Sequence, residues 1–420
     1  MEGLSDGLAL ATARRRPSFW KRLVLSRIQN LANGEMVLVD QDGECRVGTR
    51  AQDGLCVRLT IHRPRLWRRV VFGGLLGSIE AHIDGDWDVD NLTDLARLFS
   101  RNIDQVASLD SGLGRVIRPA AKLRYLLSRN SRLGAKRNIS AHYDLGNDFF
   151  ELMLDPTMTY SCGAFERADA SLEEASVAKI DRLCRKLGLH ADDHLVEIGS
   201  GWGAFAVHAA SRYGCRVTTT TISQQQYDVA VRRVADAGLT GRVTVLQTDY
   251  RDLKGQYSKL VSVEMIEAVG AEYFGEFFKS CASLLQPDGV MAIQAITVAD
   301  QRFEAAKRAV DFIKHHIFPG SCIPSVGALL GASSQVSDLR LVDLEDLTPH
   351  YARTLAEWRA NLERNHEAVA RITTERFRRL WRIYLSYCEG GFQERHTGLV
   401  QMVLARPDWR GEVDRAWTTA

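Results

Sequence analysis

The sequence predicts an α/β protein, in which a mostly parallel sheet carries helices on both faces and a smaller α+β domain precedes it. Two observations support this class. From about residue 139 onward, apolar strand-like segments alternate with helical segments. One of those strands runs directly into the glycine turn Gly199–Gly203, and a helical stretch follows the turn. Strand, helix and strand at this spacing favour a parallel sheet whose ligands bind at the carboxyl ends of the strands.

Length and composition allow two or three domains and exclude several classes of protein. We divide the 420 residues into an accessory domain (1–111), a basic connector (112–138) and a catalytic domain (139–420). The net charge of +2 gives no overall attraction to nucleic acid. No apolar run approaches the roughly 18–20 residues that span a bilayer. The 8 cysteines lack C-x-x-C spacing, which argues against a zinc site or a disulfide framework and favours a reducing cytosol.

The accessory domain is expected to begin with an amphipathic basic helix over residues 17–33. Its apolar face consists of Trp20, Val24, Ile28 and Leu31. This helix either lies on a membrane surface or packs on its own domain. Between residues 36 and 90 we expect strands in the segments MVLVDQDG, ECRVGTR, LCVRLTIHRP, VVFGG and SIEAHIDGDWDV. A helix over 91–102, capped by Asn91, closes the domain.

The connector at 112–138 is strongly basic. Its positive residues are Arg115, Arg118, Lys122, Arg124, Arg129, Arg132, Lys136 and Arg137. Anionic lipid headgroups attract such a segment by roughly 1 kcal/mol per basic residue near the surface. The alternative is a solvated linker helix. No recognised nucleic-acid-binding module accompanies the charge, so nucleic acid is not an expected partner.

The catalytic domain is expected to alternate strands with helices. The strands are HLVEIG, CRVTTTTI, RVTVLQTD, KLVSVEMI and GVMAIQAIT, and the helices lie near residues 203–213, 223–237 and 271–285. Gly199, Gly201 and Gly203 permit backbone angles that side chains forbid, and they let the main chain approach a ligand closely. The helix after them directs unpaired N–H groups toward that ligand.

The residues after the second and third strands discriminate between cofactors. A dinucleotide site favours an acidic residue about 20 positions after the glycine turn. None stands at the end of the second strand, where Thr221, Ile222 and Ser223 follow. Hydroxyls there and the amides of residues 224–226 can hydrogen-bond a ribose or methionine group. Asp249, after the third strand, is placed to accept from an adenine amino group. This layout resembles class I S-adenosylmethionine-dependent methyltransferases.

Further segments narrow the resemblance to one family. They are HYDLGNDFFELMLDPTMTYSCGAF (142–165), TISQQQY (221–227), VSVEMIEAVG (261–270), FIKHHIFPG (312–320), YARTL (351–355), YLSYCEGGF (384–392) and, in the accessory domain, GSIEAHIDGDWDVDNLTDL (77–95). Together they resemble the cyclopropane-fatty-acyl-phospholipid synthase family. The resemblance implies that S-adenosylmethionine methylates the cis double bond of an unsaturated phospholipid acyl chain and forms a cyclopropane ring. The alternative is methylation without ring closure, which gives a methyl-branched unsaturated chain.

The same resemblance, with the residues discussed above, assigns the cofactor site. Tyr160 and Ser161 would close over S-adenosylmethionine, and Trp202 would pack beside the cofactor or shield it. The expected cofactor-binding residues are Tyr160, Ser161, Glu197, Gly199, Gly201, Trp202, Gly203, Thr221, Ile222, Ser223, Gln226, Asp249 and Tyr250.

The base implied by the resemblance is bicarbonate. Its expected ligands here are Cys162, Glu267, Gln294, Ile296 and Tyr351. Glu267 would orient the ion by hydrogen bonding, and Tyr351 would donate its hydroxyl. Cys388 resembles a cysteine once proposed as catalytic in the family. We expect Cys388 to pack or to line the pocket, because this reaction needs no thiol nucleophile.

Three residues depart from the family pattern. One is Ala268, because the family commonly has E-H-V-G where this chain has Glu267-Ala268-Val269-Gly270. Gln294 stands where the family commonly has His; it can donate and accept but carries no positive charge, so anion binding should weaken. Glu264 stands three residues before Glu267, where the family often has a small residue. Either Glu264 is itself the proton acceptor, or it is a solvated or structurally paired acid. The position of the base alone can switch the product between ring and branch.

The remaining expectations concern metals, partners and location. His315 and His316 are adjacent, so a helix would point them about 100° apart, and we expect no metal site. The expected partners are an unsaturated phospholipid and the bilayer surface, and the expected assembly is a homodimer. We expect a cytoplasmic protein, peripheral on the inner face of the membrane. Two other interpretations stay open: a methyltransferase for a small soluble substrate, and a lipid-binding protein without catalysis.

Overall fold

The computed structural model describes residues 18–109 and 146–414, and it divides into two compact units, Met1–Ile117 and Arg118–Ala420. The expected connector at 112–138 and both expected domain boundaries lie outside the described residues. The three-domain division therefore stays a prediction, and each unit is described by itself.

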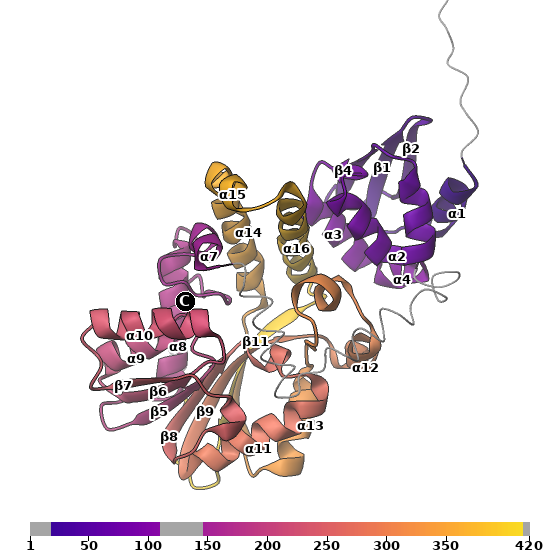
Figure 1. Ribbon diagram of the computed structural model, residues 1–420. Helices are drawn as coiled ribbons and strands as arrows, with labels where there is room; N and C mark the ends of the chain where they lie inside the picture. The colour runs from indigo at the N-terminus through magenta and orange to yellow at the C-terminus, as the bar shows by residue number, and fades with distance from the viewer. Residues whose placement is uncertain (1–17, 110–145, 415–420) are drawn as a thin grey trace, which may run out of the picture. The chain divides into compact units, whose positions relative to one another are not determined.

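The N-terminal unit combines a four-stranded sheet with helices (Figure 1). Its strands are β1 (Gly34–Asp40), β2 (Gly43–Thr49), β3 (Cys56–Ile61) and β4 (Trp87–Val89), in the order β2-β1-β3-β4. Its helices are α1 (Phe19–Ile28), α2 (Arg65–Ile83), α3 (Leu92–Arg101) and α4 (Ile103–Leu109). Sheet and helices share one apolar core, in which Leu31, Val57 and Leu98 are completely buried.

Helices α1 and α3 confirm two predicted helices. Helix α1 ends at Ile28 rather than near residue 33, and Val24 and Ile28 are buried in the core of their own unit. These two side chains therefore favour the packed alternative for this helix over a membrane-facing one. Helix α3 begins after Asn91, whose side-chain oxygen accepts from two N–H groups of the first turn, as predicted.

Helix α2 corrects the sequence analysis. The strands predicted at residues 70–74 and 78–83 are wrong, because this stretch is helical from Arg65 to Ile83 with a kink at Gly74, where φ is 59°. The buried residues of its first half include Leu66, Trp67, Val70 and Val71. That spacing places them on one face of the helix. In the sequence, however, the five-residue run VVFGG is too short for the periodicity of its apolar residues to distinguish a helix from a strand.

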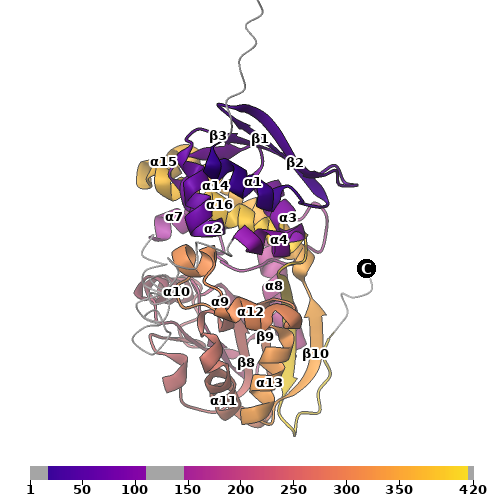
Figure 2. The ribbon, with the colours of Figure 1, turned by 90° about the vertical axis from the view of Figure 1, so that its right-hand side faces the viewer.

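The C-terminal unit is built on a seven-stranded sheet (Figures 1 and 2). The strand order is β10-β11-β9-β8-β5-β6-β7. The strands are β5 (His194–Ile198), β6 (Arg216–Thr220), β7 (Val243–Leu246), β8 (Tyr257–Val263), β9 (Leu285–Thr297), β10 (Arg340–Asp346) and β11 (Gly398–Ala405). Strands β5 to β9 are parallel, which confirms the predicted strands, whereas β10 and β11 add an antiparallel edge that was not predicted.

Helices cover both faces of this sheet. They are α7 (Asn147–Met153), α8 (Leu172–Lys186), α9 (Ala204–Tyr213), α10 (Gln224–Asp236), α11 (Phe274–Leu284), α12 (Asp300–Arg308), α13 (Val326–Val336), α14 (Thr348–Arg364), α15 (His366–Ile372) and α16 (Glu375–Gln393). Helices α8, α9 and α10 share one apolar core with the sheet, and α11 and α13 share another. Figure 1 shows these two groups on opposite sides of the strands, as predicted.

The longest helices among the described residues, α2 and α16, each have 19 residues. Neither they nor any other helix in 18–109 or 146–414 is apolar over a length that would cross a bilayer.

Candidate active site

The site begins at the glycine turn after β5. Gly199, Gly201 and Gly203 have φ angles of 95°, 48° and 90°, a region that residues with side chains adopt only with strain. A Cβ atom at Gly203 would also lie 3.1 Å from a residue of helix α10. The N–H groups of Gly199 and Ser200 donate to the carbonyl of Thr220 at 3.0 and 2.9 Å. These bonds join the turn to the end of β6 and leave a fixed backbone cradle before helix α9.

The residues that follow β6 form the next part of the site. The Thr221 hydroxyl donates to the side-chain oxygen of Gln226 at 2.8 Å. Ser223 caps helix α10 by accepting from the N–H of Gln226. Ile222 lies between them in the chain. The Thr221 bond fixes the orientation of the Gln226 amide beside the carboxyl end of a parallel strand, where ligands of such sheets bind.

Two predicted cofactor residues already have protein partners. The Glu197 carboxylate accepts from the Thr219 hydroxyl at 2.5 Å, and burial raises the pKa of Glu197 to about 7. Both oxygens of Asp249 accept from the Arg251 guanidinium, at 2.8 and 2.6 Å. The expected contacts of Glu197 and Asp249 with the cofactor stay predictions.

Tyr250 supplies a test of whether a nucleoside ligand fits. Its hydroxyl is buried and has no hydrogen-bond partner among the described residues, which is costly unless a ligand satisfies it. Burial raises the Tyr250 pKa, so this hydroxyl is a neutral donor. Together with the glycine cradle and the oriented Gln226, it forms a site that fits S-adenosylmethionine.

The segment before α8 brings the predicted Tyr160 and Ser161 to fixed positions. The hydroxyls of Tyr160 and Tyr384 are 2.9 Å apart and hydrogen-bonded. Nζ of Lys179, a residue of α8, donates to Oγ of Ser161 at 2.8 Å. The indole N–H of Trp202 donates to a side chain on α7 at 2.8 Å, so Trp202 is held by packing and a hydrogen bond within its own unit.

Glu264 is the centre of the predicted base site. It directly follows β8, and its Oε1 accepts from the backbone N–H of Cys162 at 2.9 Å and from Nε2 of Gln294 at 2.7 Å. The Tyr351 hydroxyl donates to Oε2 of Glu264. Gln294 also donates to the carbonyl of Cys162 at 3.3 Å. Three predicted residues from distant parts of the chain therefore donate to the carboxylate of Glu264, so this acid is paired within the protein instead of solvated.

Two features of Glu264 are unfavourable by themselves: its left-handed backbone conformation and the ionised form of its side chain. Its φ of 48° is left-handed, which costs about 1–2 kcal/mol for a residue other than glycine. Burial raises the pKa of Glu264, while its hydrogen bonds to Tyr351, Cys162 and Gln294 and the charge of Lys179 act in the opposite direction. Such conflicts between local conformation and burial are typical of functional sites.

Glu267 differs from Glu264 although it lies only three residues later. Its Oε1 accepts from the N–H of Ile296 at 2.5 Å, as the predicted grouping of these two residues requires. Its Oε2 is buried and has no hydrogen-bond partner among the described residues. Burial and the nearby charge of Glu264 raise the pKa of Glu267 to about 8. Glu267 is therefore protonated at neutral pH.

The two predicted site cysteines are thiols rather than thiolates. Burial and the charge of Glu264 raise the pKa of Cys162 well above its usual value. Burial and Asp311 likewise raise the pKa of Cys388. None of the hydrogen bonds described around Glu264 involves Cys388, which agrees with its expected packing role.

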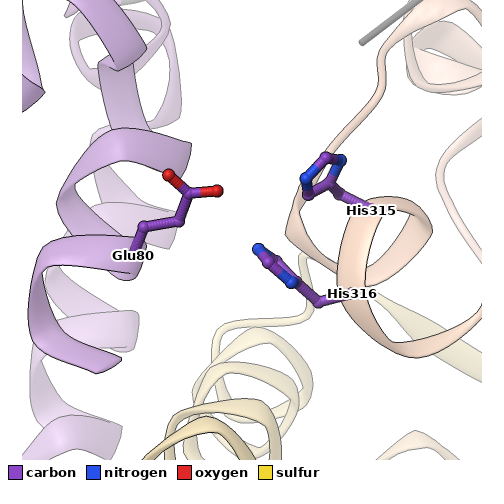
Figure 3. Close-up of side chains that lie close together, drawn as sticks. All are labelled: Glu80, His315 and His316. Atoms are coloured by element: carbon purple, nitrogen blue, oxygen red, sulfur yellow. The ribbon is translucent and has the colours of Figure 1, made fainter. Parts of the chain in front are cut away.

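His315 and His316 lie on the π-helical turn Ile313–Ile317 (Figure 3). Their rings meet edge to face, with centroids 4.5 Å apart. Figure 3 also labels Glu80, which belongs to helix α2 of the N-terminal unit. The expected absence of a metal stays a prediction.

Two buried polar residues of the site were missed by the sequence analysis. Lys179 is 2% exposed within helix α8, and Gln401 is completely buried in β11. The available signal was a lysine on the apolar face of a helix and a glutamine inside the apolar run GLVQMVLA. Such residues are rarely buried without a partner.

Comparison with known proteins identifies the family. The model of the mycolic acid cyclopropane synthetase family matches residues 130–402. The chain belongs to this family. Tuberculostearic acid methyltransferase of Mycobacterium tuberculosis is 38% identical over 88% of this chain and 87% of that protein. Cyclopropane-fatty-acyl-phospholipid synthase of Escherichia coli is 33% identical over 86% of this chain and 91% of that protein. The protein is thus an S-adenosylmethionine-dependent methyltransferase, as the resemblance implied.

Solved structures of this synthetase family confirm the predicted class I methyltransferase fold. A cyclopropane synthase from Mycobacterium tuberculosis is 33% identical, with a TM-score of 0.60 over 64% of this chain and 98% of that chain. A mycolic acid cyclopropane synthase solved with SAH and CTAB gives the same values. Coclaurine N-methyltransferase, at 19% identity and a TM-score of 0.61, shares the fold.

Proposed function

We propose that this enzyme methylates the cis double bond of unsaturated fatty acyl chains in phospholipids, with Glu264 as the proton acceptor. The names of two relatives, a tuberculostearic acid methyltransferase and a cyclopropane-fatty-acyl-phospholipid synthase, support a fatty acyl substrate. The observation that carries the proposal is the half-buried carboxylate of Glu264, which is held by three donors at the carboxyl end of the sheet.

The reaction needs a base and a dry cleft. Bound S-adenosylmethionine supplies an electrophilic methyl group. The π electrons of the alkene form the new C–C bond, which leaves a carbocation on the acyl chain. Loss of one proton then restores neutrality, and the two electrons of the broken C–H bond form either a new double bond or the third side of a ring. Water would trap the cation, so it must be excluded.

Glu264 fills the role that the resemblance assigned to bicarbonate. The N–H of Cys162, the amide of Gln294 and the hydroxyl of Tyr351 were expected to hold that ion, and all three donate to Glu264 instead. A bicarbonate ion would have to compete with the Glu264 carboxylate for these three donors. We therefore infer a base built into the chain.

Aromatic side chains pack around Tyr351, which donates to this base. The Tyr351 ring stacks on Phe392 with centroids 4.3 Å apart, and Trp358 meets Tyr351 and Tyr160 at 6.2 and 5.2 Å. Aromatic faces stabilise a cation without attacking it. This aromatic packing supports chemistry that passes through a carbocation.

For the product, we propose a methyl-branched unsaturated chain. The relative that is 38% identical is named a methyltransferase, whereas the synthase named for the ring is 33% identical. Ring closure remains the second candidate because the matching family model is named for cyclopropane synthetases. The two products arise from the same cation and differ only in which C–H bond breaks.

Lipid analysis tests the proposal. Phospholipids from cells expressing the full chain should gain one CH₂ on unsaturated acyl chains, and cells expressing Glu264→Gln should not. Mass spectrometry detects the gain, and NMR separates the high-field cyclopropane protons from a branched alkene. Unchanged lipids in cells that contain folded enzyme would contradict the proposal.

Attachment to the membrane and dimer formation belong to the same proposal. We infer that the basic residues 112–138, which lie outside the described residues, bring the enzyme to anionic lipid. Co-sedimentation with vesicles of anionic and of neutral phospholipid, at low and high salt, measures this attraction. Sedimentation equilibrium measures the assembly state.

A further inference from the structure

Glu264 is connected to a third strand of the sheet through two glutamines. Strand β11 runs antiparallel to β9, and Gln401 of β11 lies directly opposite Gln294 of β9. Strand β8, which ends next to Glu264, pairs with the other edge of β9. The series of hydrogen-bonded side chains Gln401–Gln294–Glu264 therefore connects three neighbouring strands of the sheet.

The hydrogen bonds in this series run in one direction. Nε2 of Gln401 donates to Oε1 of Gln294 at 2.9 Å. Nε2 of Gln294 then donates to Glu264 at 2.7 Å and to the carbonyl of Cys162 at 3.3 Å. Both glutamines are buried, with 0% and 1% of their surface exposed. Water therefore does not replace these bonds.

The contact with Gln401 adds to the bonds that set which end of Gln294 faces the base. If the Gln294 amide were turned over, its oxygen would point at the Glu264 carboxylate and at the Cys162 carbonyl. Its NH₂ group would then point at the NH₂ group of Gln401. All three contacts would pair donor with donor or acceptor with acceptor, so the donor end of Gln401 strengthens the preference for the orientation in which Gln294 donates to Glu264.

Gln401 is buried at a cost to its own oxygen. Oε1 of Gln401 has no hydrogen-bond partner among the described residues, and an unsatisfied buried acceptor destabilises a fold. An apolar residue at this position would avoid that cost. Gln401 therefore uses only its NH₂ group, which donates to Gln294, and its oxygen contributes no bond within the described part of the chain.

We propose that Gln401 is a positioning residue for the proton acceptor and that it acts through Gln294. The inference rests on the proposed role of Glu264 as the base. Gln401 touches neither Glu264 nor a reacting atom. It holds Gln294 in the donating orientation, and Gln294 stabilises the ionised form of Glu264, which is the form able to accept a proton.

The first test compares two substitutions of similar size. Gln401→Met removes the donor, so Gln294 can turn and Glu264 becomes harder to ionise. We expect the acid limb of the kcat/KM profile to move up by about one pH unit and the rate below that limb to fall roughly tenfold. Gln401→Glu is expected to stay protonated when buried and to donate in place of the amide, so it should keep the profile close to wild type.

The assay uses the purified full chain, labelled S-adenosylmethionine and vesicles of dioleoyl phosphatidylglycerol. Met402→Leu is the matched control, because Met402 is equally buried in β11 but faces the other core. It should leave the pH profile unchanged. The KM for S-adenosylmethionine should also stay constant in all Gln401 variants, since the cofactor residues are not in this chain of bonds.

A double-mutant cycle tests the route through Gln294. Gln294→Leu should lower activity, and adding Gln401→Leu to it should have almost no further effect, because the path is already broken. In the double variant both amides are replaced, so no buried amide is left without a partner. Its activity can therefore be compared with that of Gln294→Leu even if Gln401→Met does not fold. Additive losses, or a wild-type profile in Gln401→Met, would overturn the inference.

The two proposals fail in different ways. If Glu264→Gln keeps full activity, Glu264 is not the base and the proposed function loses its proton acceptor. If Glu264→Gln is inactive while Gln401→Met matches wild type at every pH, only the positioning role of Gln401 is lost.

Discussion

Two carboxylates, one in each unit, are held by opposite kinds of partner. The Asp86 side chain, in the N-terminal unit, is completely buried and contacts the guanidinium groups of Arg63, Arg65 and Arg69 at 3.3, 2.7 and 3.2 Å. Glu264, in the C-terminal unit, is bonded by a backbone N–H, an amide and a phenol, all of them neutral. The three arginines carry full charges, whereas the direct donors to Glu264 carry none.

The pKa shifts of these two acids differ in sign as a result. Burial opposes ionisation of Asp86, but Arg65 and Arg69 outweigh it and lower the Asp86 pKa. Burial also opposes ionisation of Glu264, and there the neutral donors and Lys179 do not outweigh it, so the pKa rises. An acid held by guanidinium groups stays charged and fixes structure, whereas an acid held by neutral donors takes up a proton at a higher pH than an ordinary carboxylate does.

The largest expected effect is the loss of activity in Glu264→Gln. The amide keeps the size of the side chain but cannot accept the proton, so the methylation rate should fall by about 10²–10⁴. Transfer of label from S-adenosylmethionine to oleoyl phospholipid measures it. Added bicarbonate should not restore activity, because the amide still fills the space among the donors. Glu272→Gln, at an exposed acid nearby, is the control; bicarbonate-dependent activity in Glu264→Gln would refute the comparison.

Asp86→Asn should affect stability instead of catalysis. We expect the N-terminal unit to lose about 2 kcal/mol, less than for a fully buried ion pair because Arg63 and Arg65 reach solvent. Urea unfolding measures this loss. Since the folded pKa of Asp86 is lowered, its contribution is present above its unfolded pKa and is lost as the pH falls through the folded value. The gap between wild type and variant should therefore narrow in acid.

The control for Asp86→Asn is Asp53→Asn, which breaks an exposed ion pair with Arg97 and Arg101. That change should cost clearly less than Asp86→Asn, because solvent screens an exposed ion pair. Equal losses for the two variants would mean that burial of Asp86 adds nothing to the stabilisation.

Lys179→Met should have a smaller effect, of roughly tenfold. Removing this buried charge raises the pKa of Glu264 further, so the acid limb of kcat/KM should move up by about one unit. The KM for S-adenosylmethionine should rise as well, because Ser161 loses its hydrogen bond to Nζ. Lys179→Arg, which keeps the charge, should restore the pH profile. If the acid limb of the kcat/KM profile does not move in Lys179→Met, the neutral donors alone set the pKa of Glu264.

Glu267→Gln should have the smallest effect. Because its pKa is raised to about 8, Glu267 is already neutral at pH 7, and a neutral amide of the same size can still accept from Ile296. Activity at pH 7 should fall by no more than about threefold. Wild type should lose activity as the pH rises through about 8, and the variant should not. A loss as large as that of Glu264→Gln would show that both glutamates need their charge.

Much of this site could be predicted because it lies in local motifs. The glycine turn and the five parallel strands follow from residues that stand in continuous segments. The grouping of Cys162, Gln294 and Tyr351 follows from the family resemblance, which placed them around an ion, whereas Glu264 was expected only to face the same site as Glu267. The helix α2 was misassigned because its short apolar runs fit two periods equally well. The edge strands were missed because their antiparallel partners are distant in sequence: β11 pairs with β9, more than 100 residues earlier, and β10 pairs with β11, more than 50 residues later.

The roles of Lys179 and Gln401 could not be predicted for a related reason. Each occupies an ordinary position in its own element, a helix face and an apolar strand. Only the tertiary fold shows that the helix places Nζ beside Ser161, and that the strand register places Gln401 opposite Gln294.

The left-handed backbone at residue 264 allows the proposed proton acceptor to be removed without changing the path of the chain. Glycine adopts this φ without strain, so Glu264→Gly should keep the path of the backbone and remove only the carboxylate. Small solutes such as formate could then enter among the vacated donors and restore turnover in a concentration-dependent way. A single substitution would thus replace a carboxylate that is covalently attached to the chain with one that binds from solution.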